Sequence, residues 1–111
     1  MRFFTPTPMT YAKACELIST NKSPVTIPLT KSVSLEWDGQ HHHITLGATR
    51  IVTINPDGSH TIRTGGWFTK TTQERISRYS HCPIKIRQGE WWVVTPQGEV
   101  AYQEGMQLLP N

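Results

Sequence analysis

The spacing of apolar residues changes along the chain and separates one short helical segment from a series of extended ones. Near the N-terminus, apolar side chains recur at the positions of one helical face, at Tyr11, Ala14, Cys15 and Ile18. Thr10 before them is a suitable N-cap. We therefore expect a helix over about residues 10–20, after an extended arm at residues 1–9 that contains two Thr-Pro pairs.

From residue 32 onwards the apolar period is two, which is typical of strands that bury one face. Asp38-Gly39 and Pro56-Asp57-Gly58 are turn signals between such segments. Residues 23–31 contain two prolines and fit an extended linker or an edge strand. The alternation predicts strands at residues 32–37, 41–46, 49–54, 59–64, 84–87, 91–95 and 100–102.

A double glycine ends the segment 59–64 and leads into the strongest local motif of the chain. Trp67 and Phe68, which follow it, are expected to anchor the bend in the core. Thr71-x-x-Glu74 matches a capping box, in which the threonine hydroxyl accepts from an amide of the first turn. This motif predicts a second helix over about residues 72–80.

These elements define an α+β protein. We expect the 111 residues to form a single small domain, with a mostly antiparallel sheet of five to seven short strands, two short helices and a tail at residues 104–111. The sequence has no apolar run near the ~20 residues of a membrane-spanning helix, and Pro6 and Pro8 interrupt any secretory signal. We expect a soluble, cytoplasmic protein.

The net charge is +3, but the basic residues are concentrated in the middle of the chain. The segment from Arg50 to Arg87 contains seven basic and two acidic residues, whereas the segment after Arg87 contains three glutamates and no lysine or arginine. This asymmetry predicts one positive and one negative surface. Ordinary solvated faces are the alternative.

The two cysteines, Cys15 and Cys82, lie far apart and fit no zinc-binding or redox spacing. In a reducing cytosol we expect two buried free thiols, with a disulfide as the alternative.

His41-His42-His43 is the candidate metal-binding motif. Alternation along a strand places His41 and His43 on one face, so a third ligand would have to come from His60 or His81. The alternative is a polar strand face that is exposed to solvent. We expect this alternative, with no metal or cofactor.

The basic segment indicates an anionic partner. The start of the second helix would present free amides beside Lys70 and two threonine hydroxyls, and the basic residues after it could line one groove with it. One of two neighbouring tryptophans could stack on a base, because adjacent strand residues face opposite sides. The candidate binding residues are Arg63, Lys70, Thr71, Thr72, Arg75, Arg78, Lys85, Arg87 and Trp92.

Some of these residues have structural alternatives. Arg75 could pair with Glu74, Glu90 or a carboxylate of the sheet and fix the helix on the sheet. Trp91 and Trp92 could lie in the core and under the helix. Paired-carboxylate catalysis is disfavoured, because the only two aspartates each precede a turn glycine. The enzymatic hypothesis is a small metal-free ribonuclease that would use His60, Arg63, Thr71 and Arg75.

Residues 49–95 resemble a pattern found in small uncharacterised proteins of tailed bacteriophages. That pattern is strand, turn, strand, the motif Gly-Trp-x-Thr-x-Thr-Thr-x-x-Arg-Ile, a short helix and a Trp-rich hairpin. It corresponds here to Asp57-Gly58, Gly66-Trp67, Thr69, Thr71-Thr72, Arg75-Ile76 and Trp91-Trp92. The resemblance covers under half of the chain. It implies a phage origin and brings no catalytic residue with it.

Four functional hypotheses follow. The first is a non-enzymatic phage-type binding protein that presents a basic face to an anionic partner, for example as an inhibitor of a host defence effector such as a CRISPR nuclease. The second is a direct nucleic-acid-binding protein. The third is a protein that sequesters a nucleotide signal, often at the interface of a homo-oligomer. The fourth is the ribonuclease. The first three are set in the cytoplasm of an infected bacterium and involve no membrane.

Overall fold

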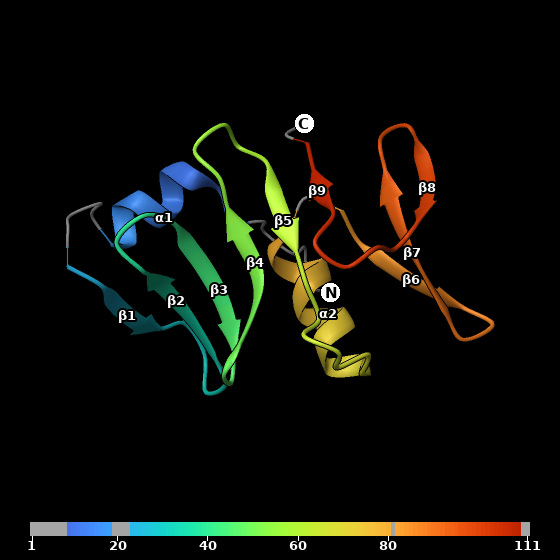
Figure 1. Cartoon of the computed structure of the whole chain (residues 1–111), viewed down its shortest axis with the longest axis horizontal. Coiled ribbons are helices and arrows are strands. Elements are labelled where there is room, and N and C mark those ends of the chain that lie inside the picture. Colours follow the sequence, from blue (N-terminus) through green and yellow to red (C-terminus); the bar gives the residue numbers. More distant parts are fainter. Residues whose placement is uncertain (1–8, 19–22, 81, 110–111) are drawn as a thin grey trace, which may run out of the picture.

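The computed structural model describes residues 9–18, 23–80 and 82–109. Within these ranges the chain forms two helices and nine strands, arranged as two antiparallel sheets (Figure 1). The α+β class and the antiparallel pairing are thus confirmed. The strand count exceeds the predicted five to seven, and the predicted single sheet is replaced by two. No helix in the described ranges is both long and apolar enough to cross a membrane.

The large sheet has the strand order β1-β2-β3-β4-β5-β9. Its strands are β1 (Val25–Pro28), β2 (Val33–Trp37), β3 (His42–Leu46), β4 (Thr49–Ile54), β5 (His60–Ile62) and β9 (Gln107–Leu108). The first five follow one another as hairpins, and the last returns from the C-terminal segment to pair with β5. The predicted tail therefore contains an edge strand of this sheet, and Leu108 is buried.

The small sheet contains β6 (Ile84–Arg87), β7 (Glu90–Thr95) and β8 (Gly98–Ala101), paired in that order. It is separated from the large sheet in sequence by α2 (Lys70–Tyr79), which contacts β3, β4 and β6 (Figure 1). A two-sheet arrangement arises because the chain leaves the large sheet after β5, forms α2 and the small sheet, and then comes back.

The core lies on one face of the large sheet. Val33, Leu35 and Trp37 of β2 are buried while the residues between them are not, as the period of two requires. A bulge between Ile44 and Thr45 shifts the register with β4. The helices supply Ala14 and Ile18, from α1 (Tyr11–Leu17) and its C-cap, and Ile76 and Tyr79 of α2.

The start of α2 differs from the prediction. Thr69 is the N-cap, with extended backbone, and its Oγ accepts a hydrogen bond of 3.1 Å from the amide of Thr72. The predicted capping box at Thr71 and Glu74 is therefore wrong, and the helix begins two residues earlier than expected. Thr69, Thr71 and Thr72 could each serve as an N-cap, and the extended backbone at Thr69 places the cap at that residue.

The expected anchoring of Trp67 and Phe68 in the core is also wrong. Gly65 and Gly66 have φ values of 65° and 91°, in the left-handed region that favours glycine. The turn they form directs the chain outward, and the two aromatic side chains are 64% and 57% exposed. Phe68 still contacts Trp91 at its edge, with ring centroids 5.1 Å apart, whereas Trp67 faces solvent.

Candidate functional site

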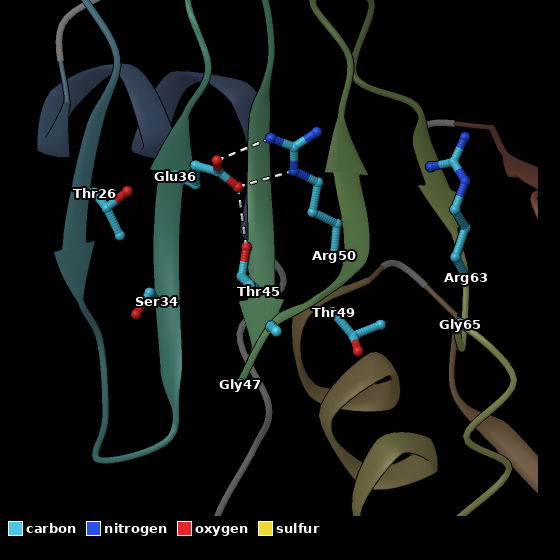
Figure 2. Close-up of a pocket in the computed structure, with 10 residues that line it drawn as sticks. Thr26, Ser34, Glu36, Thr45, Gly47, Thr49, Arg50, Arg63 and Gly65 are labelled. Carbon is cyan, nitrogen blue, oxygen red and sulfur yellow. Dashed lines mark hydrogen bonds and ion pairs between the residues drawn. The ribbon is translucent and has the colours of Figure 1, made fainter.

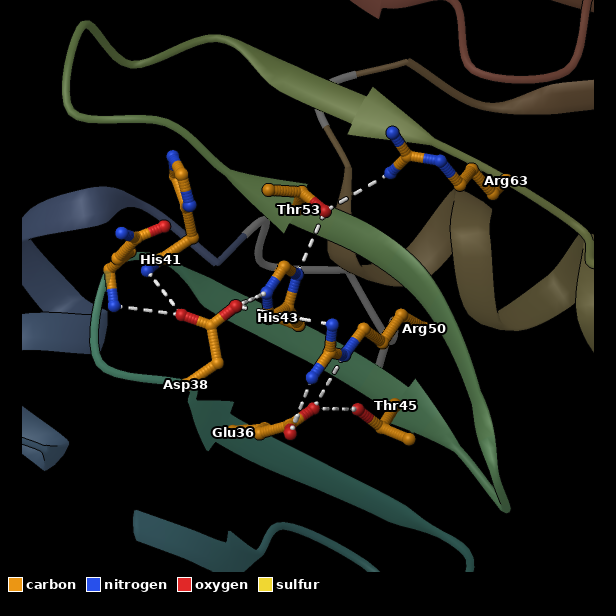
Figure 3. A network of polar contacts seen from close by, with 9 residues as sticks. Glu36, Asp38, His41, His43, Thr45, Arg50, Thr53 and Arg63 are labelled. Atoms are coloured by element: carbon orange, nitrogen blue, oxygen red, sulfur yellow. Dashed lines mark hydrogen bonds and ion pairs between the residues drawn. The ribbon is translucent and has the colours of Figure 1, made fainter. Parts of the chain in front are cut away.

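The outer face of the large sheet is polar. Both helices pack on the opposite face, and the strands present hydroxyl and charged groups outward (Figures 2 and 3). We call this surface the polar face. It comprises Thr26, Ser34, Glu36, His43, Thr45, Arg50, Thr53, Thr61 and Arg63.

Glu36 and Arg50 form a bidentate ion pair across β3. Arg50 Nε lies 2.9 Å from Glu36 Oε1, and its second terminal nitrogen lies 2.9 Å from Oε2 (Figure 2). Thr45 adds a hydrogen bond of 3.3 Å to the same carboxylate. The hydrogen bonds from Arg50 lower the pKa of Glu36, although burial opposes the shift. The charge of Arg50 is thus largely balanced.

A chain of hydrogen bonds connects Asp38 to Arg63 (Figure 3). Asp38 Oδ2 lies 2.8 Å from His43 Nε2, and His43 Nδ1 lies 2.9 Å from Thr53 Oγ. Arg63 donates to Thr53 Oγ at 3.3 Å. The turn aspartate also accepts backbone amides at 2.8 and 2.7 Å. We call this chain the Asp38 relay.

The acid–base states of the relay follow from its contacts. Burial would raise the pKa of Asp38, but hydrogen bonds from His43 and two backbone amides lower it well below its usual value. Burial lowers the pKa of His43, against the opposing effect of Asp38. A carboxylate only accepts, so neutral His43 carries its proton on Nε2, and its Nδ1 accepts from the Thr53 hydroxyl. The oxygen of Thr53 then accepts from Arg63.

Arg63 ends the relay with most of its hydrogen-bonding capacity unused. The hydrogen bond to Thr53 is the one that its guanidinium makes among residues 9–18, 23–80 and 82–109, and within these ranges it forms no ion pair. The side chain is exposed. An arginine without a protein carboxylate is available to an anion from outside.

Three pockets adjoin one another, two on this surface and one around the β3–β4 turn beside the start of α2, and we call them together the groove. The first, of about 410 Å³, is shared by β3, β4 and β5, and the second, of about 670 Å³, also has Arg50 and Arg63 in its lining. The third, of about 490 Å³, shares Ala48 and Thr49 with the second and has Trp67 in its lining. The groove therefore extends from the histidines of β3 to the exposed tryptophan.

The end of the groove at Trp67 is more apolar. Leu46 and Ala48 line it together with the threonines at the start of α2. Lys70 lies between two lining residues in the sequence, is exposed, and forms no ion pair within the described ranges. Gly65 holds this end close to the sheet, because a Cβ there would lie 2.8 Å from Thr49 Cγ2.

Of the predicted binding residues, the structure brings Arg63 and Thr71 to the lining of the groove, and Lys70 lies next to Thr71 in the first turn of α2. Thr72 is 2% exposed, and its hydroxyl lies 3.0 Å from Thr69 Oγ, so it stabilises the helix start. Arg75 pairs with Glu74 at 3.3 Å, one of the partners that the structural alternative named, but both residues belong to α2, so this pair does not fix the helix on the sheet. Arg78 lies in the last turn of α2.

The remaining predicted residues lie on the small sheet. Lys85 and Arg87 both pair with Glu99 of β8, the former at 3.5 Å. The Arg87 guanidinium lies over the Trp92 ring, 5.4 Å from its centroid. Trp91 is buried, so one tryptophan is in the core and the other faces outward. The expected separation into a positive and a negative surface is not seen on the small sheet, because Glu99 from the acidic C-terminal segment pairs with the cations of β6.

The histidines do not form the expected exposed strand face. His42 is fully buried beside Trp37, and His43 is 6% exposed. Only His41 of the three is exposed. In the ranges that the structure describes, no three His, Cys, Asp or Glu side chains gather closely enough to hold a metal ion. His81 lies outside these ranges.

The predicted ribonuclease set is not assembled. His60 is fully buried, and its Nε2 lies 2.8 Å from the carbonyl oxygen of Met9, so it cannot reach a ligand. Arg75 is engaged with Glu74. Cys15 and Cys82 are free thiols, as expected, although Cys15 is only partly buried.

Sequence reasoning missed most of the polar face. Glu36, Arg50 and Thr53 were not proposed as site residues, His43 was considered only as a metal ligand and Asp38 only as a turn residue, although the period of two places residues 36, 43 and 45 opposite the apolar ones. The missing information was the register between strands, which brings Glu36 opposite His43 and His43 opposite Thr53.

Comparisons with protein-family models, curated proteins and solved structures give no match for this chain. The function is therefore argued from the geometry.

Proposed function

We propose that this protein is a non-enzymatic binding protein that holds single-stranded nucleic acid along the groove. In this proposal Trp67 stacks on a base, and Arg63 and Lys70 contact phosphates. The observation that carries the proposal is the exposure of Trp67, at 64%, beside a pocket. An exposed aromatic platform combined with cations is the usual design of proteins that bind single strands.

Charge supports a polyanion as the occupant. Arg63 and Lys70 form no ion pair in the described part of the chain, whereas Glu36 and Asp38 are already engaged with Arg50 and His43. Glu36 is neutralised by Arg50, and Asp38 keeps its negative charge beside neutral His43, with Arg50 at 3.9 Å, whereas Arg63 and Lys70 have no acid partner among the described residues. Its hydroxyl groups add further donors for phosphate and sugar oxygens.

Binding of fluorescein-labelled oligo(dT) and oligo(rU), measured by anisotropy over a salt series, tests the proposal. Contacts from two cations give a slope of about −1.4 in log affinity against log salt, at about 0.7 per phosphate for single strands. Trp67→Ala should weaken binding, and Trp92→Ala, at the outward tryptophan of the small sheet, is the matched control. A wild-type protein that shows no salt-dependent binding would contradict the proposal.

A second candidate is favoured by a separate surface. Ile86 and Val100 of the small sheet are 46% and 42% exposed, and the pairing register places them on the same face. Leu109, 70% exposed, lines a pocket with Val100. Such apolar exposure fits docking on a protein, as an inhibitor of a host defence effector would require, and the resemblance to phage proteins agrees with that role.

Affinity capture from a bacterial lysate separates the two candidates. Capture of a stoichiometric protein that Val100→Glu abolishes and Trp67→Ala does not would favour the inhibitor. Nucleic acid that co-purifies and leaves at high salt would favour the direct binding proposal.

A further inference from the structure

The pocket of about 410 Å³ at the far end of the groove gathers hydrogen-bond donors from three strands and the turns beside them. Arg63 points toward Thr53 and the centre of this surface (Figure 3). The lining residues are His41, His43, Arg50, Thr53, Asn55, Thr61 and Arg63.

Several of these donors have no acceptor among residues 9–18, 23–80 and 82–109. The side-chain amide of Asn55 donates to Thr61 Oγ at 3.3 Å, so the hydroxyl proton of Thr61 is directed elsewhere. Arg63 uses one hydrogen bond, to Thr53. His41 is exposed, and its ring contacts His43 with centroids 6.3 Å apart. Guanidinium, hydroxyl and imidazole groups are the donors that bind phosphate in proteins.

The acids near the pocket are occupied. Glu36 accepts both hydrogen bonds of Arg50. Asp38 accepts from His43 and from two backbone amides. Glu36 is thus neutralised by Arg50, and Asp38 keeps its charge but already accepts three hydrogen bonds, while the guanidinium of Arg63 remains without a carboxylate among the described residues.

We propose that this pocket is a phosphate-binding subsite, in which Arg63, Thr61 and His41 hold one phosphate group of a bound strand. That the phosphate belongs to a nucleic-acid strand rests on the proposed function, whereas the affinity of the pocket for phosphate does not. The Asp38 relay positions Arg63, since Thr53 is held by His43 and His43 by Asp38.

The relay also links this subsite to pH. When His43 gains a proton, both ring nitrogens donate, and the Thr53 oxygen accepts from Nδ1 instead of donating to it. The Thr53 hydroxyl proton is then free to bond the anion. The charged and titratable groups around His43 are Glu36 of β2, Asp38 and His41 of the turn, His42 of β3, Arg50 of β4 and Arg63 after β5. The affinity for a phosphodiester should therefore rise as the pH falls toward 5.5.

The first test is a titration of the ¹⁵N-labelled protein with inorganic phosphate, followed at the Arg63 Nε–Hε resonance and at the Thr61 amide. We expect saturable shifts at both. Arg63→Met and Thr61→Val should each weaken phosphate binding, the former at least tenfold, while Lys13→Met on the exposed face of α1 should leave it unchanged. Shifts spread evenly over all exposed arginines, or equal affinity in Arg63→Met, would overturn the proposal.

The second test uses oligo(dT), whose phosphodiesters keep their charge between pH 5.5 and 7.5. Affinity should rise about threefold over this range both in the wild-type protein and in His41→Gln, and Thr53→Val in the latter background should abolish the rise. Phosphate binding at Arg63 without any binding of oligo(dT) or oligo(rU) would retain the subsite and reject the proposed function. Strand binding that depends on Trp67 but not on Arg63 would retain the function and overturn the subsite.

Discussion

The outer faces of the two sheets carry similar residues in different states. The small sheet combines Lys85, Arg87 and Trp92, but Glu99 pairs with both cations and the arginine covers the ring. Beside the large sheet lie Arg63, Lys70 and Trp67. Among the described residues, no acid pairs with these two cations and no cation lies over this tryptophan. The comparison teaches that the count of basic residues in a segment says little about binding. What decides is whether the fold brings an acid to each of them.

The largest difference in stability is expected between variants of two C-terminal glutamates, Glu104 and Glu99. Glu104 accepts hydrogen bonds from the Thr64 amide, the Thr64 hydroxyl, the Gly65 amide and the Tyr102 hydroxyl, and we call this contact the Glu104 clamp. Thr64 is fully buried. Glu104→Ala would leave buried donors unpaired and should lower the free energy of unfolding by about 3 kcal/mol.

The matched variant is Glu99→Ala, which removes an exposed ion pair and should cost at most about 1 kcal/mol. Urea unfolding monitored by circular dichroism measures both. Equal losses in the two variants would show that the clamp is no more than a surface contact.

The two outward tryptophans test the comparison directly. Trp67→Ala should weaken binding of oligo(dT) by about five- to 150-fold, corresponding to the ~1–3 kcal/mol of one stacked base. Trp92→Ala should change the affinity less than twofold, because Arg87 already occupies its face. Fluorescence anisotropy gives both values. Trp67 is largely exposed, so its removal should leave the unfolding midpoint almost unchanged.

Acid should destabilise the protein in two steps, both located mainly in the large sheet. Burial lowers the pKa values of His42 and His43 in the folded protein. As the pH falls below about 6.5, these histidines take up protons in the unfolded chain before they do so in the folded one, and the free energy of unfolding therefore decreases. Asp38 and Glu104 have lowered pKa values too, which removes further stability below about pH 4.

Urea midpoints between pH 7.5 and 3.5 measure the two steps. His43→Gln keeps hydrogen-bonding groups for Asp38 and Thr53 but cannot gain a proton. It should flatten the first step in part, with His42 responsible for the remainder. A first step of unchanged size in this variant would rule out His43 as its source.

The smallest effect is expected from restoring charge to the small sheet. Glu99→Gln leaves Lys85 and Arg87 without their shared carboxylate. Affinity for oligo(dT) should rise about two- to fivefold, within the ~1 kcal/mol of an exposed ion pair, and the gain should vanish in high salt. No gain in affinity at low salt would mean that pairing with Glu99 is not the reason why this face binds weakly.

The sequence predicted the elements well, and the contacts between them poorly. Period-two alternation placed β2, β3 and β4 close to their observed bounds, because burial of one face imposes that period directly. The alternation could not predict that His42 and His43 are both buried. His42 is covered by Trp37 on one face of the sheet, and His43 is held by Asp38 and Thr53 on the other face.

The candidate site was predicted in part for the same reason. Arg63 was identified as part of the basic segment and Lys70 as the cation at the start of the second helix; Arg63 lines the groove, and Lys70 neighbours its lining residue Thr71. Lys85 and Arg87 were grouped with them because they are near in sequence, but the pairing of β7 with β8 brings Glu99 to their strand. The double glycine signalled a bend, but its positive φ angles, which send Trp67 outward, are a property of the folded backbone.

The Glu104 clamp has a consequence for synthesis on the ribosome. Strands β1 to β5 emerge in pairing order, and every residue of the groove is made long before the segment that carries Glu104 and β9. Until that segment leaves the exit tunnel, the amides of Thr64 and Gly65 have no carboxylate to bond. A nascent chain released before Glu104 would carry the whole candidate interface and still lack the contact that sets the turn at Trp67.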